Sequence, residues 1–358
     1  MKICLFGTYN SQYSRNRVIK RGLEENGVIV LECNDRSSGI KKYLNLYKKF
    51  KLLKKEVDFL LVGFPGYGAA IFAKIFSGKK IIFDAFASIY DSMVLDRRVV
   101  SVFSIKSFYY FLLDFLACHM SDWVLVDTLA QKDFFIKTFK IKPEKILVVY
   151  VGADIPQNFF IQTKKIRNGP IKVFFYGTFI PLQGVDVILK SAKLLEKITH
   201  LRHPPTGGGG LKFEIMGQGQ TFPEAKKLAK KLALQNVEFL PSHSYAELLN
   251  HLNAADISLG IFGSTSKSQR VVPNKVFDAL ALGVPCITQD SQAVREILKD
   301  GENCIFTKPH DETDLASKIR LLMSDAHLRD KIGKEGQKLF LEKFIPQKVV
   351  MSVLSILK

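Results

Sequence analysis

The chain has 358 residues, more than one hydrophobic core usually organises, so its length predicts about two domains. Its 47% apolar residues and mean hydropathy of +0.08 exclude a disordered protein. The formal charge of +18, from 52 Lys and Arg against 34 Asp and Glu, indicates an anionic partner such as nucleic acid, anionic lipid or a phosphorylated substrate. The five cysteines never form a C-x-x-C pair, which argues against a disulfide framework or a cysteine metal site and indicates a reducing compartment.

The first half of the chain has six apolar strand-like runs that alternate with helical segments. These runs are unbroken, which predicts a parallel sheet covered by helices on both faces. In such sheets ligands lie beyond the carboxyl ends of the strands, so three loops are candidate binding segments. The predicted strands cover residues 2–6, 28–33, 59–62, 80–83, 123–126 and 146–149, and the three loops cover residues 7–10, 63–68 and 84–91.

The segment 41–57 is predicted to form a basic amphipathic helix. Tyr43, Leu46 and Phe50 recur at helical spacing, whereas the segment also holds seven lysines and the single acidic residue Glu56. Such a helix can lie on an anionic membrane surface, or it can dock on the sheet as an ordinary surface helix. The two interpretations stay open and are compatible, with the apolar stripe inward and the lysines outward.

A second aromatic and basic segment, 103–111, either joins the same membrane contact or belongs to the core. Any membrane contact is expected to be peripheral, because no signal peptide is visible at the start of the sequence. The longest uncharged run, 59–73, is interrupted by glycines and a proline and is shorter than the roughly 20 residues that a spanning helix needs. The protein is therefore expected to be cytoplasmic and peripheral at the membrane.

A second domain is predicted after the polar stretch 157–170, which ends in Gly-Pro. The glycine-rich stretch 203–210 is interpreted as an insertion that does not cradle phosphate, since a strand rather than a helix follows it. The predicted domains are residues 1–160 and 161–344, and the C-terminal helix 345–358 is expected to pack back on the first. The strands of the second domain are predicted over residues 171–176, 213–216, 237–240, 257–259, 286–288 and 304–306.

Residues 268–288 combine the features of an anion-binding loop. A polar loop ends at a proline, a short helix follows, and a glycine marks its end. Arg270, Asn274 and Lys275 cluster near the start of this helix, where free N–H groups and the helix dipole favour an anion. Asp278 follows on the same helix. The alternative is an ordinary loop arginine, a capping asparagine and solvated charges.

Two further glycine turns follow predicted strands of the second domain, at Gly177 and at Gly217 with Gly219. Glycines in such turns let backbone N–H groups approach a pyrophosphate without obstruction by side chains. Each turn alone is weak evidence. Because loops of successive parallel strands converge on one crevice, their recurrence predicts a nucleotide site.

Five segments of the second half occur in a characteristic order. They are FYGTFIPLQGVD at 175–186, FEIMGQG at 213–219, NVEFL at 236–240, AAD at 254–256 and PNKVFDALA at 273–281. In this order and spacing they resemble the C-terminal domain of family 4 glycosyltransferases of GT-B fold. In the first half the similarity lies mainly in residues 117–154, where SDWVLV at 121–126 and VGAD at 151–154 match the end of that family's first domain.

The resemblance implies two facing Rossmann-like α/β domains with parallel sheets, the second binding a nucleoside-diphosphate sugar and the first an acceptor. It also implies anomeric retention, no cofactor and no required metal, since positive groups and helix dipoles stabilise the leaving diphosphate. On this basis the predicted donor-binding residues are Gly177, Thr178, Gln183, Gly217, Gly219, Asn274, Lys275 and Asp278.

Several family positions carry different residues in this chain. The family usually has two glutamates, one at the donor sugar and one at the ribose, where this chain has Arg270 and Asp278. Asp278 can still accept from ribose hydroxyls, whereas a guanidinium only donates hydrogen bonds. The family also often has an Arg and a Lys where this chain has Thr178 and Gln183. We therefore expect Arg270, with Lys275, to supply the diphosphate contacts; the alternative is a degenerate site that binds a nucleotide without turnover.

The acceptor side is less clearly marked. The family often places a histidine at a strand end facing the sugar, and this chain has no histidine before His119. Asp84 directly follows a predicted strand, so it is favoured for orienting the acceptor hydroxyl, and Arg270 and Asp84 are the predicted catalytic residues. The alternative for each such loop residue is a helix cap. The other predicted acceptor-side residues are Gly7, Thr8, Ser88 and Asp91.

Together these features favour a retaining glycosyltransferase of polysaccharide biosynthesis. Its expected partners are a nucleotide-sugar donor, a lipid-linked or glycan acceptor, and an anionic membrane surface contacted through the helix 41–57. The alternatives are a nucleotide-binding partner subunit without turnover and a sugar-nucleotide epimerase of GT-B fold. Nucleic acid is not an expected partner, because it explains the charge but predicts no converging glycine turns.

Overall fold

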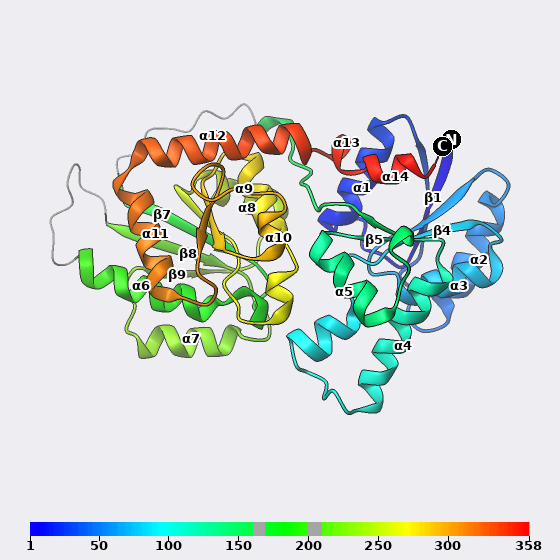
Figure 1. Cartoon of the computed structure of the whole chain (residues 1–358), viewed down its shortest axis with the longest axis horizontal. Helices are drawn as coiled ribbons and strands as arrows, with labels where there is room; N and C mark the ends of the chain where they lie inside the picture. The colour runs from blue at the N-terminus through cyan, green and yellow to red at the C-terminus, as the bar shows by residue number, and fades with distance from the viewer. Residues whose placement is uncertain (160–168, 200–209, 358) are drawn as a thin grey trace. The chain divides into compact units, whose positions relative to one another are not determined.

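The computed structural model describes residues 1–159, 169–199 and 210–357. The chain forms two compact units, Met1–Asp154 with Lys343–Lys358, and Ile155–Glu342. Each unit is a parallel sheet with helices packed on it (Figure 1). The predicted boundary stretch 157–170 and the predicted insertion 203–210 lie mostly outside the described residues.

The sheet of the first unit has the strand order β2-β1-β3-β4-β5-β6, and every pair in it is parallel. The first half therefore folds as the unbroken apolar runs predict, and the six predicted strands are confirmed. Their bounds are β1 Lys2–Gly7, β2 Ile29–Asn34, β3 Phe59–Val62, β4 Lys80–Asp84, β5 Trp123–Val126 and β6 Ile146–Val148.

The sheet of the second unit has the order β12-β11-β10-β7-β8-β9 and is also parallel throughout. The six strands predicted in the second half are confirmed as well. Their bounds are β7 Ile171–Tyr176, β8 Leu211–Met216, β9 Val237–Leu240, β10 Ile257–Leu259, β11 Cys286–Gln289 and β12 Ile305–Thr307.

Helices connect the strands of both sheets. In the first unit they are α1 Ser14–Glu25, α2 Lys41–Leu53, α3 Tyr67–Phe76, α4 Ile105–Met120 and α5 Leu129–Phe139. Later in the chain come α6 Val185–Thr199, α7 Phe222–Lys231, α8 Tyr245–Asn253, α9 Asn274–Ala281, α10 Gln292–Arg295, α11 Glu312–Ser324, α12 Ala326–Lys343, α13 Pro346–Val349 and α14 Met351–Ser355.

Strand β1 shows why the apolar runs are unbroken. Ile3 and Leu5 belong to a core cluster that includes residues of α1, α13 and α14. Cys4 and Phe6 point the other way, into a cluster that includes residues of α2, α3 and α5. Because successive side chains of a strand face opposite sides, a sheet covered on both faces needs apolar residues at every position.

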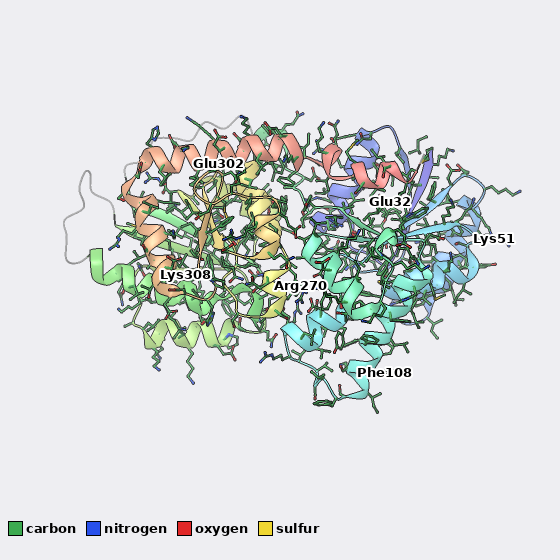
Figure 2. The ribbon with its side chains drawn as sticks, in the orientation of Figure 1. Glu32, Lys51, Phe108, Arg270, Glu302 and Lys308 are labelled. Atoms are coloured by element: carbon green, nitrogen blue, oxygen red, sulfur yellow. The ribbon has the colours of Figure 1, made fainter. Side chains whose placement is uncertain are left out.

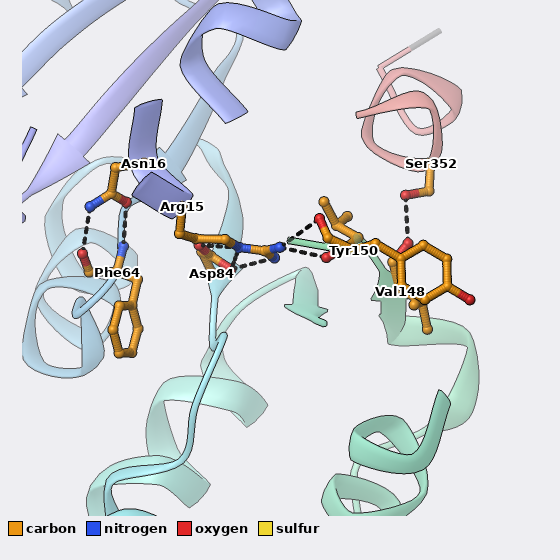
Figure 3. A network of polar contacts seen from close by, with 8 residues as sticks. Arg15, Asn16, Phe64, Asp84, Val148, Tyr150 and Ser352 are labelled. Carbon is orange, nitrogen blue, oxygen red and sulfur yellow. Dashed lines mark hydrogen bonds and ion pairs between the residues drawn. The ribbon is translucent and has the colours of Figure 1, made fainter. Parts of the chain in front are cut away.

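The C-terminal segment packs on the first unit. A Cβ added to Gly22 of α1 would lie only 2.2 Å from the Pro346 carbonyl oxygen, so the absent side chain allows α1 and α13 to approach closely. Val350 and Val353 are fully buried in the α1 cluster. Ser352 Oγ donates to the Val148 carbonyl over 2.9 Å (Figure 3).

Helix α2 turns its apolar stripe inward. Leu46 and Phe50 are fully buried, whereas Lys41, Lys48 and Lys51 are exposed. The helix therefore docks on the sheet with lysines facing solvent, an arrangement that is compatible with membrane contact but does not demonstrate it. None of the described helices has the length and apolar composition needed to cross a bilayer.

Candidate functional site

The loops after β7 and β8 meet at the carboxyl end of the second sheet. Gly177 and Gly217 have φ of +157° and +134°, in the range that favours glycine. A Cβ on Gly217 would lie 2.1 Å from the Gly177 carbonyl oxygen, and one on Gly219 would lie 2.6 Å from that of Phe179. The close packing of the two loops therefore explains by itself why Gly217 and Gly219 are glycines. Their predicted contact with a donor stays a prediction.

Lys275 reaches from the first turn of α9 to the loop after β7. Its ammonium donates to Gln183 Oε1 and lies 3.7 Å from the centroid of the Phe175 ring. A Cβ on Gly177 would lie 3.0 Å from the same nitrogen, so the glycine leaves room for the ammonium. The structure thus brings together three of the predicted donor-binding residues, Gly177, Gln183 and Lys275.

The Lys275 ammonium is buried without a carboxylate partner. The residue is only 3% exposed, and among the described residues no acidic side chain forms an ion pair with it. Burial therefore lowers the pKa of Lys275 well below its usual value, because the charged form loses its hydration. An anion entering this position would provide the missing counter-charge.

Asp278 lies on the same helix and is almost fully buried. Its carboxylate accepts from the hydroxyls of Tyr176 on β7 and Tyr245 on α8, the latter over 2.8 Å. These bonds tie α9 to its neighbours, so the carboxylate has a structural role that the sequence does not suggest. The predicted ribose contact of Asp278 stays a prediction.

Arg270 lies on the loop that precedes α9 (Figure 2). The residue is half-buried, and its Nη1 donates to the Ser266 carbonyl over 3.0 Å. The next residue, Val271, packs in one cluster with Ile180 and Leu182. The loop that carries Arg270 is therefore held against the loop after β7, on the side of the unit where Lys275 lies.

The remaining two predicted donor residues flank this arrangement. Asn274 is the half-buried first residue of α9, and Thr178 is exposed after Gly177. Pro273 occupies the position before the helix and makes no side-chain cap bond to the first turn of α9. Free amide groups at a helix start attract anions, so this end of α9 adds to the positive potential around Lys275.

The structure places Asp84 in a different setting from the predicted catalytic one (Figure 3). Asp84 is 1% exposed and Arg15 is fully buried, and the two form an ion pair in which Arg15 Nη2 lies 3.0 Å from Asp84 Oδ1. Arg15 Nε also donates to Asp84 Oδ2 over 3.1 Å, and Nη1 donates to the carbonyls of Val149 and Tyr150. A carboxylate held by a guanidinium in this way has a structural role in the fold, and the predicted role of Asp84 in orienting the acceptor hydroxyl stays a prediction.

Ser88 and Asp91 are also buried rather than open to a ligand. Ser88 Oγ donates to Asp114 Oδ2 over 2.6 Å and accepts from the Asp91 backbone N–H over 2.9 Å. Asp114 Oδ2 accepts in addition from the Tyr90 backbone N–H over 2.9 Å. These bonds hold the loop after β4 in place, which is a structural role for two predicted acceptor-side residues.

The contribution of Asp114 to the stability of the first unit should fall as the pH rises from about 4 to about 6. Burial raises the pKa of Asp114 from 3.8 to about 6, so the folded state holds its proton more tightly than the unfolded state. The contribution is present below the ordinary pKa and is lost as the pH rises through the folded pKa. At about 1.4 kcal/mol for each pH unit it amounts to about 3 kcal/mol.

Chemical denaturation at several pH values tests this expectation, with Asp114→Asn as the comparison. Asparagine keeps an oxygen that accepts from Tyr90 but does not titrate. The difference in unfolding free energy between wild type and the variant should therefore change between pH 4 and pH 6, although other carboxylates add their own slopes to both proteins. A constant difference across that range would show that Asp114 does not titrate as expected.

Gly7 and Thr8 lie at the carboxyl end of β1. Gly7 has φ of +138°, and its carbonyl oxygen accepts from the Asp35 backbone N–H over 3.1 Å. Thr8 is half-buried. No contact of either residue points to a ligand within the described part of the chain, so their acceptor-side role stays a prediction.

Among the described residues, no group of three or more His, Cys, Asp or Glu side chains is arranged to hold a metal ion. The expectation that the reaction needs neither metal nor cofactor stays a prediction.

Sequence reasoning missed four residues of these networks, Arg15, Asp114, Tyr176 and Tyr245. Arg15 meets Asp84 across 69 positions of sequence, and the local pattern of a helix start gives no sign of that partner. Tyr176 ends a predicted strand and Tyr245 starts a helix, so both look like ordinary half-buried aromatics. The one available signal is that a buried carboxylate needs hydrogen-bond donors, which indicates that partners such as these must exist.

Comparison with known proteins places the second unit in a family. A family model described as glycosyl transferases group 1 matches residues 156–339, just over half of the chain. An uncharacterized glycosyltransferase of Methanocaldococcus jannaschii is 25% identical over 49% of this chain and 44% of its own length. Chitobiosyldiphosphodolichol beta-mannosyltransferase of Yarrowia lipolytica is 27% identical over 37% of this chain and 27% of its own length. The chain thus spans less than half the length of these curated relatives.

Solved structures of GT-B glycosyltransferases match the whole chain. HepE of Anabaena, in complex with UDP, has a TM-score of 0.71 at 15% identity, over 100% of this chain and 99% of HepE. Sucrose-phosphate synthase of Thermosynechococcus elongatus has a TM-score of 0.75 at 10% identity, over 100% of this chain and 98% of its own. These likenesses confirm the predicted α/β fold with two parallel sheets. Together with the matched family model, they show that the chain belongs to the glycosyl transferases group 1 family.

Proposed function

We propose that this protein is a retaining, family 4 glycosyltransferase that moves a sugar from a nucleoside-diphosphate sugar to an acceptor. The observation that carries the proposal is the buried Lys275 ammonium, which Gln183 holds at the carboxyl end of β7 beside the start of α9. A buried cation without a carboxylate partner is costly unless an anion joins it. The diphosphate of a sugar nucleotide is an anion of that kind.

Lys275 would act on the leaving group. Negative charge develops on the diphosphate as its bond to the sugar breaks, and a cation placed there lowers the energy of that transition state. Because burial keeps the pKa of Lys275 low in the free protein, the arriving diphosphate would favour protonation of its amine. The charge would then be present where the transfer needs it.

Arg270 is proposed as the second cation at the diphosphate. Arg270→Ala should lower turnover by about 100-fold or more, because one preorganised donor to a developing anion contributes that much. The melting temperature should stay close to that of wild type, since Arg270 is only half-buried. Arg320→Ala, an exposed arginine of the same unit, is the matched control. A wild-type rate in the Arg270 variant would show that this residue does not contribute to transfer.

Release of nucleoside diphosphate from a panel of UDP-, GDP- and ADP-sugars tests the function itself. UDP-sugars come first, because a HepE structure similar in fold contains UDP. A transferase should release the nucleoside diphosphate, and faster once its acceptor is added. A partner subunit would bind a donor and release nothing, and an epimerase would change the sugar while it stayed attached to the nucleotide.

The acceptor is proposed to be lipid-linked or a polysaccharide, reached by a cytoplasmic protein at the membrane surface. One relative carries a diphosphodolichol lipid in its name, which supports a lipid-linked substrate of this class. The lysines of α2 face solvent and suit an anionic lipid surface.

A further inference from the structure

Six apolar side chains around the start of α4 are exposed. Phe103 in the preceding loop is 99% exposed, Ile105 is 89% exposed and Phe108 is 65% exposed. Figure 2 labels Phe108 on α4. The sequence left open whether this segment belongs to the core, and the structure places much of it at the surface. We call this surface the α4 tip and define it as Val102, Phe103, Ile105, Phe108, Tyr109 and Leu112.

The start of α2 is connected to α4 through α3. Tyr43 packs on Phe72 of α3 with ring centroids 5.0 Å apart, and α3 in turn packs on α4. Ile40 and Leu44, at this end of α2, are 76% and 59% exposed, so the first unit exposes apolar side chains here as well.

The chain segments that carry these apolar side chains are basic. Residues 97–113 contain Arg97, Arg98 and Lys106 and no Asp or Glu. Residues 36–55, which include α2, contain eight Lys or Arg and again no acidic residue. Exposed aromatic and aliphatic side chains among cations match the boundary between anionic headgroups and acyl chains, where aromatic rings are favoured.

We propose that the α4 tip inserts into the headgroup region of an anionic bilayer while Lys106 and the lysines of α2 contact the headgroups. The inference deepens the proposed function and rests on it, because it names the surface that would bring the enzyme to a membrane acceptor. A second copy of the chain fits less well. In a symmetric dimer the same patch meets itself, so these cations would face their own counterparts.

Vesicle co-sedimentation with the full chain and no donor tests the proposal. Binding to phosphatidylcholine vesicles that contain about a third phosphatidylglycerol should exceed binding to pure phosphatidylcholine many-fold. Phe103→Ser with Phe108→Ser should lower the partition by about tenfold or more, through loss of buried apolar area. Lys106→Glu should lower it by at least about fivefold on anionic vesicles only. Leu321→Ser with Met351→Ser, which also removes exposed apolar side chains, should leave binding unchanged.

The outcomes separate this surface from the proposed function. Nucleoside-diphosphate release without vesicles should be the same in wild type and in the Phe103 and Phe108 variant. Release of nucleotide without vesicle binding would overturn the docking surface and leave the transferase function intact. Vesicle binding without nucleotide release from any donor would support the docking surface and contradict the transferase function. A concentration-dependent dimer that the serine variant abolishes, with no vesicle binding, would assign the tip to a second copy instead.

Discussion

Lys275→Met should lower turnover of the nucleotide-sugar donor by about 100-fold or more, and it should not destabilise the protein. The ammonium lies beside Gly177 and Gln183, at the proposed position of the diphosphate. Methionine has a similar length and no charge, so it removes the counter-charge to the leaving group. Because burial disfavours the charged lysine, an apolar side chain should leave the unfolding free energy unchanged or raise it.

The measurement is the rate of nucleoside-diphosphate release together with the melting temperature. Lys190→Met, on the half-exposed surface of α6, is the matched control and should change neither quantity appreciably. A Lys275 variant that keeps the wild-type rate would remove the basis of the proposed donor site. A variant that loses both rate and stability would show that the lysine is needed for the fold, and the rate would then carry no information about its role.

Arg15→Met should destabilise the first unit by about 3–5 kcal/mol, because it leaves a buried carboxylate without its partner. Asp84 is 1% exposed, and two nitrogens of the guanidinium contact it. The same variant also removes the donor to the carbonyl oxygens that follow β6. Few single side chains of this protein combine so complete a burial with so many polar contacts.

The double variant Arg15→Met with Asp84→Leu distinguishes a structural pair from a catalytic aspartate. If the pair acts in folding, the double variant should be more stable than Arg15→Met alone, since no unpartnered charge remains. Donor hydrolysis per folded molecule should then stay near the wild-type value in Asp84→Asn. An Asp84→Asn protein with wild-type stability and a rate about 100-fold lower would instead restore the predicted catalytic role.

Much of the fold can be predicted from the sequence, because strands buried on both faces of a parallel sheet appear as unbroken runs of apolar residues. Ile3, Cys4, Leu5 and Phe6 are apolar in succession, and the structure buries them in two clusters on opposite faces of β1. The start and end of α9 can also be predicted from the sequence, since proline precedes the helix and a glycine with φ of +62° follows it.

The candidate site follows from the sequence only in part. Lys275 can be placed at a helix start from its neighbours, but its burial against Phe175 and its bond to Gln183 depend on tertiary packing. Asp84 directly follows a strand, where ligand-binding carboxylates often lie, yet its partner Arg15 is distant in sequence. Polar pairs of this kind obey no spacing rule, because geometry in three dimensions decides which charges meet.

The sequence pattern alone also does not predict which aromatic side chains around α4 are exposed. The segment around Phe103 has the aromatic content of a core helix, and Phe111 and Phe115 of α4 do pack against the core. Phe103 and Phe108 are nevertheless exposed, and they lie before or at the start of α4. The exposed and the buried phenylalanines can be told apart only once the position of α4 on the unit is known.

Calorimetric titration of wild type and Lys275→Met with UDP, GDP and ADP tests the central claim most directly. We predict that wild type binds one of these nucleotides with a dissociation constant between about 1 μM and 1 mM, the usual range for enzyme substrates. Binding should weaken by at least about tenfold in the variant, since a charge-assisted contact is lost. Equal affinity of the two proteins, or no binding of any of the three nucleotides by wild type, would contradict the proposed diphosphate site at Lys275.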